Sequence, residues 1–124
     1  MRSCAVACIF LLAMTSISHG RTFSRFAQSG VSRGMHTYHS FKADCTGKGG
    51  VVKVLVKPKH GTIRHFTVTS NPYSLNHPCY RIEMEGFRVN YTSTPGYRGS
   101  DSFKLEVSFP NQPAVVDEFF VDVK

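Results

Sequence analysis

Helix-forming residues are scarce in most of this chain. From position 21 to the end, only three residues are Leu and three are Ala, whereas 36 are Val, Ile, Phe, Tyr or Thr. Leu and Ala usually fill helices, while β-branched and aromatic residues favour strands. An all-helical fold is therefore excluded. Hydrophobic residues make up 41% of the chain, and no strict glycine or heptad period occurs. Collagen-like, coiled-coil and disordered chains are excluded as well.

The chain also lacks a hydrophobic run long enough to cross a membrane. Its apolar stretch from Ala5 to Met14 is about ten residues long, whereas a transmembrane helix needs about 20. Arg2 is the only charged residue before position 21, and the small residue Gly20 follows the stretch. This layout is typical of a secretory signal peptide. We therefore expect residues 1–20 to be removed, leaving a periplasmic or extracellular protein without a transmembrane anchor; a membrane anchor is the alternative.

Cysteine is rare, and no CxxC motif is present. Removal of residues 1–20 leaves only Cys45 and Cys79. In an oxidising compartment we expect these two to form a disulfide. Closing the loop between positions 45 and 79 would stabilise the fold by roughly 3–4 kcal/mol on the chain-entropy model. A catalytic thiol activated by His65 or His77 and a metal thiolate are the alternatives.

Motifs of hydrolytic enzymes are absent. The sequence contains no GxSxG, no HExxH and no paired-carboxylate spacing. Without the first 20 residues, roughly 104 remain, which is one domain and too small for a large catalytic scaffold. We predict no catalytic residues and no cofactor. An enzyme whose nucleophile and base converge in a pocket is the alternative.

Clusters of metal ligands are missing too. A calcium site needs several carboxylates close together, and here the closest approach is the adjacent pair Asp117 and Glu118. His36 and His39 have the spacing of a metal-ligand pair, but zinc needs three or four converging ligands. We predict no metal site.

Alternating apolar and polar residues indicate the architecture. Residues 21–37 show neither a period of two nor one of 3.6, so we expect a flexible or loosely docked basic arm there. Residues 38–124 contain short apolar alternations separated by Gly, Pro, Asn and Ser, which is typical of a sandwich or barrel. Because short turns join these segments, the sheets should be antiparallel. We predict an all-β sandwich of six or seven strands.

The individual strands are predicted from the phase of this alternation. We expect a weak strand at 38–45, a strand at 50–57 with Val52, Val54 and Val56 on one face, and a strand at 62–69 with Phe66 and Val68 facing inward. A hairpin is expected at 80–92, with its turn at Gly86. The clearest strand is at 102–109, and a last strand is expected at 115–123, in which Asp117 is out of phase.

Two segments carry a resemblance to a known family. The segment from Tyr91 to Phe103 reads YTSTPGYRGSDSF and resembles the ending of bacterial immunoglobulin-like and cadherin-like repeats, which often read Y-x-P-x-x-G-Y-x-G-x-D-x-F. Upstream, PKHGT at 58–62 resembles the turn that opens the same repeats. The resemblance implies an immunoglobulin-like sandwich in an exported protein. Departures are the single copy, the cysteine pair and the insert at 71–78.

The residues of these two segments have structural roles in our interpretation. Gly96 and Gly99 can adopt positive φ, and the Asp101 carboxylate can accept backbone N–H bonds in the turn that it closes. Tyr97 can cover the edge of the core while its hydroxyl stays in water. The predicted structural-turn residues are Pro58, Gly61, Pro95, Gly96, Tyr97, Gly99, Asp101 and Phe103.

Charge is distributed unevenly along the chain. Residues 21–80 hold nine basic residues and one acid, whereas residues 81–124 hold five and seven. A basic half can attract polyanions, and the candidates for such binding are Lys53, Lys57, Lys59 and Arg64. The alternative is that these residues maintain solubility and protect a strand edge from pairing. No nucleic-acid-binding motif occurs, so we expect no nucleic acid partner.

These observations lead to one functional prediction and one alternative. We predict a non-enzymatic module for binding or structural interaction in the cell envelope, whose partner is an unidentified protein or envelope glycan. Loops at 70–78 and 93–100 are the candidate sites, because a rigid sandwich presents its loops at its ends. The alternative is a small secreted protein that binds polyanions such as anionic polysaccharide or lipid headgroups.

Overall fold

Seven β-strands make up the part of the chain that the computed structural model describes, which is residues 20–40, 45, 49–71, 73–110 and 112–124. Residues 1–19, and with them nearly all of the predicted signal peptide, lie outside it. The strands are β1 (Arg21–Ala27), β2 (Arg33–His39), β3 (Val51–Val56), β4 (Gly61–Ser70), β5 (Met84–Ser93), β6 (Gly99–Ser108) and β7 (Val115–Val123). Among these described residues no helix could cross a membrane.

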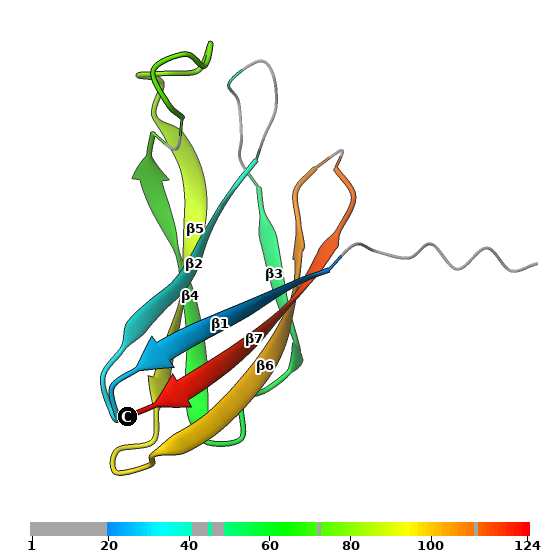
Figure 1. Cartoon of the computed structure of the whole chain (residues 1–124). Helices are drawn as coiled ribbons and strands as arrows, with labels where there is room; N and C mark the ends of the chain where they lie inside the picture. Colours follow the sequence, from blue (N-terminus) through cyan, green and yellow to red (C-terminus); the bar gives the residue numbers. More distant parts are fainter. Residues whose placement is uncertain (1–19, 41–44, 46–48, 72, 111) are drawn as a thin grey trace, which may run out of the picture.

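The strands form two sheets, one of four strands in the order β1-β7-β6-β3 and one of three in the order β2-β5-β4. Figure 1 shows the two layers, with β1, β7 and β6 side by side in one and β2, β5 and β4 in the other. The predicted all-β architecture is confirmed. Pairing is antiparallel as expected, except that β1 runs parallel to β7.

The prediction of a flexible arm at residues 21–37 is wrong. β1 pairs with β7 from Arg21 opposite Asp117 to Ala27 opposite Val123, and β2 pairs with β5 in the other sheet. Both are strands at the edge of a sheet, and a β-bulge between Gly34 and His36 shifts the register of β2. A bulge adds one residue and so interrupts the alternation of two. This interruption explains why β2 shows no regular period in the sequence.

The predicted hairpin at 80–92 is also wrong. β5 continues straight through Gly86, which lies opposite Val68 on one side and His39 on the other. A β-carbon at position 86 would collide with the Tyr38 carbonyl oxygen. The glycine is therefore needed for the close approach of β2 to β5, and the turn comes earlier, at Tyr80.

In β4 the inward face differs from the prediction. Phe66 is 45% exposed, whereas Ile63 packs against the core. The pairing with β5 explains the reversal, because Ile63 lies opposite the buried Tyr91 and Phe66 lies opposite the exposed Arg88. Residues opposite one another in a sheet share a face, so the position of β5 decides which side of β4 is buried.

In β3 the prediction holds for two of the three valines. Val52 and Val54 pack against the core, but Val56 is exposed. The register with β6 shifts between Val54 and Val56, so the alternation of inward and outward residues does not continue to the end of the strand.

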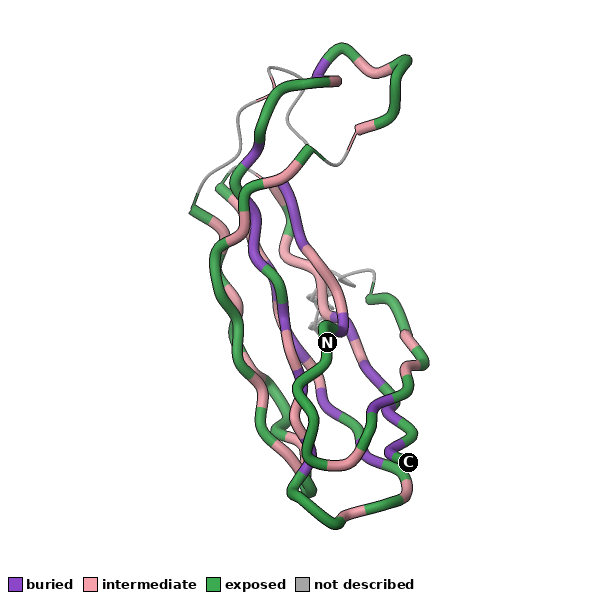
Figure 2. The backbone as a smooth tube through the Cα atoms, turned by 90° about the vertical axis from the view of Figure 1, so that its left-hand side faces the viewer, coloured by how far each residue is buried: buried purple, intermediate pink, exposed green. Residues whose placement is uncertain are grey.

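The core lies between the two sheets and is rich in aromatic rings. Phe103 of β6 stacks on Phe119 of β7 with ring centroids 4.7 Å apart, and Tyr91 of β5 stacks on Phe103 at 6.1 Å. All three residues are buried. Figure 2 shows how buried segments alternate with exposed ones along the strands. The predicted strands at 102–109 and 115–123 are confirmed.

The predicted disulfide between Cys45 and Cys79 is confirmed, with the two α-carbons 5.3 Å apart. It ties the β2–β3 connection to the β4–β5 connection. Both sulfur atoms are used in this bond, so neither is a free thiol or a metal ligand. The predicted strand at 38–45 is replaced by the end of β2 at His39; residues 41–44 lie outside the described residues.

Candidate anion-binding surface

Asp101 joins the two segments that carried the family resemblance. Its carboxylate accepts hydrogen bonds from the backbone N–H groups of Lys59 at 3.0 Å and His60 at 3.1 Å, and from that of Ser102 at 2.9 Å. The Tyr91 hydroxyl donates to it at 2.7 Å. The expected bonds to backbone N–H groups are present, but two of the three come from the turn between β3 and β4.

Tyr97 closes the same end of the molecule. Its ring stacks on the His60 ring with centroids 3.9 Å apart, and its hydroxyl donates to the Ser100 carbonyl oxygen at 2.5 Å. The hydroxyl is thus bonded to the backbone at an exposed position, and the ring packs against the core. Gly96 and Gly99 have φ of 89° and 130°, as predicted for these two glycines.

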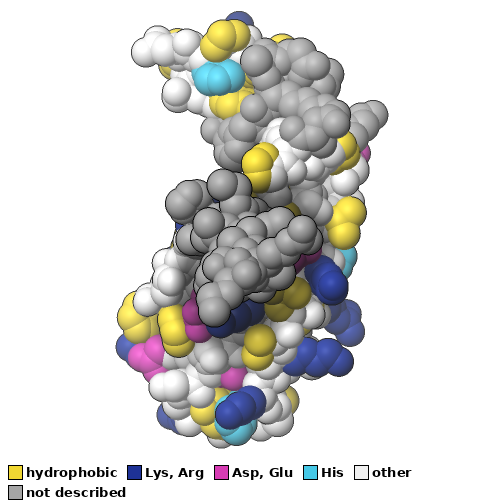
Figure 3. All heavy atoms as spheres, turned by 90° about the vertical axis from the view of Figure 1, so that its right-hand side faces the viewer, with side chains coloured by type: hydrophobic (Ala, Val, Ile, Leu, Met, Phe, Trp, Pro, Cys, Tyr) yellow, Lys and Arg dark blue, Asp and Glu magenta, His cyan; other side chains and the backbone are white. Residues whose placement is uncertain are grey.

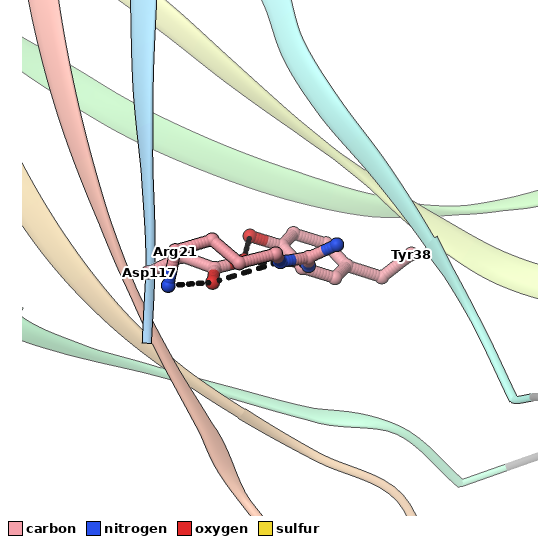
Figure 4. A network of polar contacts seen from close by, with 3 residues as sticks. All are labelled: Arg21, Tyr38 and Asp117. Carbon is pink, nitrogen blue, oxygen red and sulfur yellow. Dashed lines mark hydrogen bonds and ion pairs between the residues drawn. The ribbon is translucent and has the colours of Figure 1, made fainter. Parts of the chain in front are cut away.

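Asp117, which was out of phase in the sequence, is completely buried and binds two side chains from other strands (Figure 4). Arg21 donates to its carboxylate from Nε at 3.2 Å and from Nη2 at 2.9 Å, and the Tyr38 hydroxyl donates at 2.7 Å. The bond to Asp117 raises the pKa of Arg21. Burial, together with the same carboxylate, raises the pKa of Tyr38 far above its usual value.

Both buried carboxylates are therefore occupied within the fold. Asp101 holds a turn and Asp117 holds the first strand, and each also accepts a tyrosine hydroxyl. Asp117 is fully enclosed, whereas Asp101 borders two surface hollows with its oxygens engaged by the turn. Groups that could bind a ligand have to be sought on the surface.

Positive charge is left without acidic partners on one side of the molecule. Within the described ranges, the ion pairs are Arg21 with Asp117 at 2.9 Å and Lys104 with Glu118 at 3.9 Å. All four residues belong to the four-stranded sheet. The strands of the three-stranded sheet carry one acid, Glu85, near the start of β5. Figure 3 shows a group of basic side chains on the right-hand side, with further basic side chains at the centre and lower left, where acidic ones lie as well.

The outer face of the three-stranded sheet carries two of these cations. Phe87, Val89 and Tyr91 of β5 are buried in the core, so the alternate residues Arg88 and Asn90 point away from it. Pairing places them in rows across three strands. We call this surface the arginine face; its rows are Thr37, Arg88 and Phe66, and then Gly34, Asn90 and Arg64.

A hollow of about 350 Å³ opens on the arginine face at the β-bulge of β2. We call it the bulge hollow; it is lined by Gly34, Met35, His36, Thr37 and Arg88. Arg88 donates from Nε to the Thr37 hydroxyl at 3.3 Å. The glycine leaves the hollow open, because a β-carbon there would lie 3.4 Å from Arg88 Cδ.

The structure divides the four predicted polyanion-binding residues between different surfaces. Lys53 lies on the four-stranded sheet, opposite Glu106 of β6. Lys57 borders a separate hollow of about 270 Å³ between β3 and β4, and the Lys59 backbone binds Asp101. Of the four, Arg64 is the one on the arginine face.

Sequence reasoning missed Arg88. The alternation in β5 did place it on the opposite face from Phe87 and Val89. However, only the order of the strands brings it diagonally beside Arg64, 24 positions earlier in the chain. No local pattern contains that information.

The two predicted loops are largely occupied by contacts within the protein. In the 70–78 loop, the rings of Tyr73 and His77 stack at 3.9 Å, and His77 Nδ1 accepts the Cys79 backbone N–H at 3.0 Å. In the 93–100 loop, the Ser93 hydroxyl accepts the Gly30 N–H at 2.9 Å. Such contacts hold parts of both loops in place, while Ser74 and Asn76 of the first loop and Thr94 and Arg98 of the second are exposed.

The two histidines with metal-ligand spacing have different surroundings. The His36 ring packs against Phe23 at 4.8 Å and Tyr38 at 4.6 Å, whereas His39 Nε2 is bonded to the Ser70 hydroxyl at 2.8 Å. Burial lowers the pKa of both imidazoles. No group of three or more His, Cys, Asp or Glu side chains suited to a metal ion occurs within the described ranges.

Comparisons with known proteins do not identify a family for this chain. The chain matches no protein-family model, and no curated protein matches it. Among solved structures it is similar to the solution structure of amebosin, at a TM-score of 0.46 and 13% sequence identity, over 86% of this chain and 98% of that one. A likeness this distant carries no argument about function.

Proposed function

We propose that this protein is an exported, non-enzymatic binding module with an immunoglobulin-like fold, and that its ligand is an anionic polymer. The observation that carries the proposal is the arginine face, where Arg64 and Arg88 are exposed and have no acidic partner among the described residues. Unneutralised positive charge on one surface attracts polyanions and raises their association rate.

The strand order supports the immunoglobulin-like assignment. Immunoglobulin domains pair their second, fifth and fourth strands in one sheet and their third, sixth and seventh in the other. The same division is found here, with β1 added beside β7.

Export is supported by two independent features. The layout of the first 20 residues is that of a secretory signal peptide. The disulfide between Cys45 and Cys79 is of a kind that persists in oxidising compartments. Anionic polysaccharides are abundant surfaces outside the cell, so the proposed ligand and the proposed location agree.

A salt titration of the protein without residues 1–20 tests the proposal. We expect binding to immobilised heparin at low ionic strength and steep weakening as salt is added, because exposed charges are screened. Arg64→Gln should weaken binding, whereas Lys53→Gln, which removes a charge from the other sheet, should have a smaller effect. No retention of the wild type at low salt would refute the proposal.

A further inference from the structure

We infer that the bulge hollow is a subsite for one acidic sugar of a polysaccharide, whose carboxylate is held by Arg88. This inference rests on the proposed function and narrows it to one ligand class and one place. Its first basis is shape. The hollow of about 350 Å³ falls within the range of about 300–1,000 Å³ that is typical of small-molecule sites.

The bulge and the glycine together create this shape. β2 carries an extra residue between Gly34 and His36, and the Met35 side chain is buried. Bulges are enriched next to functional sites, where they interrupt pairing and redirect side chains. Gly34 has no side chain to fill the space beside Arg88. The surface is therefore concave at the point where an anion would be attracted.

The charged side chain that lines the hollow is Arg88, which is exposed and has no acidic partner among the described residues. Arg25 of β1 donates from Nε to the carbonyl oxygen of the neighbouring Met35 at 2.9 Å. Arginine binds carboxylates with two parallel hydrogen bonds, so Arg88 favours a planar oxyanion.

The remaining polar groups favour a ligand that carries hydroxyl groups, as sugars do. Ser32, which accepts a bond from Asn90 Nδ2 at 3.2 Å, and Thr37 present hydroxyls near the hollow. Asn90 Oδ1 lies 3.5 Å from the position of a Gly34 β-carbon and has no hydrogen-bond partner among the described residues. Sugar hydroxyls can donate to such an acceptor, whereas the ionised oxygens of polyphosphate can only accept.

An exposed aromatic ring lies in the same row. Phe66 is directly opposite Arg88 on β4, and neighbouring strands are about 4.8 Å apart. An apolar ring on an otherwise polar face suits the C–H face of a pyranose that continues from the hollow. A chain of sugars could thus lie across β2, β5 and β4.

The test measures affinity for an oligogalacturonate, whose repeating unit has one carboxylate and hydroxyls. Polyphosphate, phosphatidylglycerol vesicles and neutral dextran serve as comparison probes. Gly34→Val fills the hollow without changing charge, and Val is favourable in strands. We expect it to weaken oligogalacturonate binding about tenfold, the effect of losing one charge-assisted contact, and to change polyphosphate binding less than twofold.

Arg88→Lys is the second variant, because it keeps the charge and lies on an exposed position that does not endanger folding. Loss of the planar fork should weaken oligogalacturonate binding by a similar factor. Lys53→Gln on the other sheet is the control and should leave the affinity within twofold of wild type. Unfolding midpoints of all variants show whether the fold is retained.

The possible outcomes separate this inference from the proposed function. Wild-type oligogalacturonate affinity in Gly34→Val and Arg88→Lys, together with weakened binding in Arg64→Gln, would overturn the subsite and leave the polyanion-binding module supported. Stronger binding to the vesicles than to oligogalacturonate would overturn the choice of polysaccharide. Absence of binding to every anionic probe at low salt would overturn both.

Discussion

Two buried aspartates, 16 positions apart in the sequence, satisfy their charge in different ways. Each accepts a tyrosine hydroxyl at 2.7 Å, Asp101 from Tyr91 and Asp117 from Tyr38. Beyond that, Asp101 binds three backbone N–H groups, whereas Asp117 binds the side chain and the N–H of Arg21. One carboxylate is held by uncharged backbone donors and the other by a cation.

The difference matters when the carboxylate is removed. Backbone N–H groups in a turn are fixed in place, and leaving them without a partner costs their desolvation energy. The Arg21 side chain is 52% exposed and can turn toward water. The network at Asp101 should therefore contribute more to stability than the ion pair at Asp117, although an ion pair is the stronger interaction in isolation.

The most sensitive test of this comparison is Asp101→Ala. It leaves the backbone N–H groups of Lys59, His60 and Ser102 and the Tyr91 hydroxyl without their acceptor. At about 1–3 kcal/mol for each buried unsatisfied group, partly relieved by water, we expect a loss of about 4 kcal/mol in the free energy of unfolding. Urea denaturation measures it. Asp101→Asn, which keeps one acceptor oxygen, should lose less, and an equal loss would contradict the role of the hydrogen bonds.

Asp117→Ala should have the next largest effect. It leaves the buried Tyr38 hydroxyl unsatisfied, while Arg21 gains water, so we expect a loss of about 2–3 kcal/mol. The same urea experiment gives the value. If Asp117→Ala destabilised the protein more than Asp101→Ala, the half-exposed arginine would not be recovering its hydration and the comparison would fail.

Two tyrosine substitutions test the comparison further, because each removes the tyrosine hydrogen bond of one aspartate. Tyr38→Phe and Tyr91→Phe each delete one hydroxyl at 2.7 Å from a carboxylate oxygen. A hydrogen bond to a charged group contributes about 1.5–3 kcal/mol, so both variants should lose roughly 2 kcal/mol. Similar losses would assign the difference between the aspartates to their other partners. If the two phenylalanine variants differ in unfolding free energy by as much as the two alanine variants do, the difference between the aspartates would be due to the tyrosines.

Alkaline titration is the mildest perturbation. Burial, followed by the hydrogen bonds to Asp117 and Asp101, raises the pKa of Tyr38 and of Tyr91 well above the ordinary value of 10.0. Because the folded protein holds these two tyrosine protons more tightly than the unfolded chain does, the two tyrosines contribute their full stabilisation below pH 10.0. That stabilisation is lost as the pH rises above this value.

The unfolding free energy measured from pH 8 to pH 12 should therefore decline above about pH 10. The decline should be shallower in the variant with both tyrosines replaced by Phe. An unchanged slope in that variant would show that other groups cause the alkaline loss.

Much of the fold could be predicted from alternation and from the cysteines. The strand at 102–109 was correct because β6 has neighbours on both sides and one fully buried face, so its pattern is regular. Phe66 was assigned to the wrong face because β4 is an edge strand with a hydrophobic residue on each side. At Gly86 the sequence predicts a turn, because glycine serves both turns and close contacts and the sequence does not distinguish them.

The candidate site could be predicted only in part. Arg64 was identified from the charge of the first half of the chain, but Lys53 was grouped with it although the two lie on different sheets. Arg88 and the bulge hollow were missed. Residues 21–37 were treated as an arm, and so the strand that forms one wall of the hollow was not considered at all.

Local properties of the chain are enough to specify the class of the molecule: short strands, one disulfide between Cys45 and Cys79, and glycines at 96 and 99, where φ is positive. These follow from local steric preference and from side-chain chemistry, which act over a few residues. The pairing of strands in three dimensions determines which face of each strand is buried, which donors bind Asp101 and Asp117, and which arginines share a surface. Those outcomes depend on the pairing of strands that are distant in the chain, and no local preference encodes that pairing.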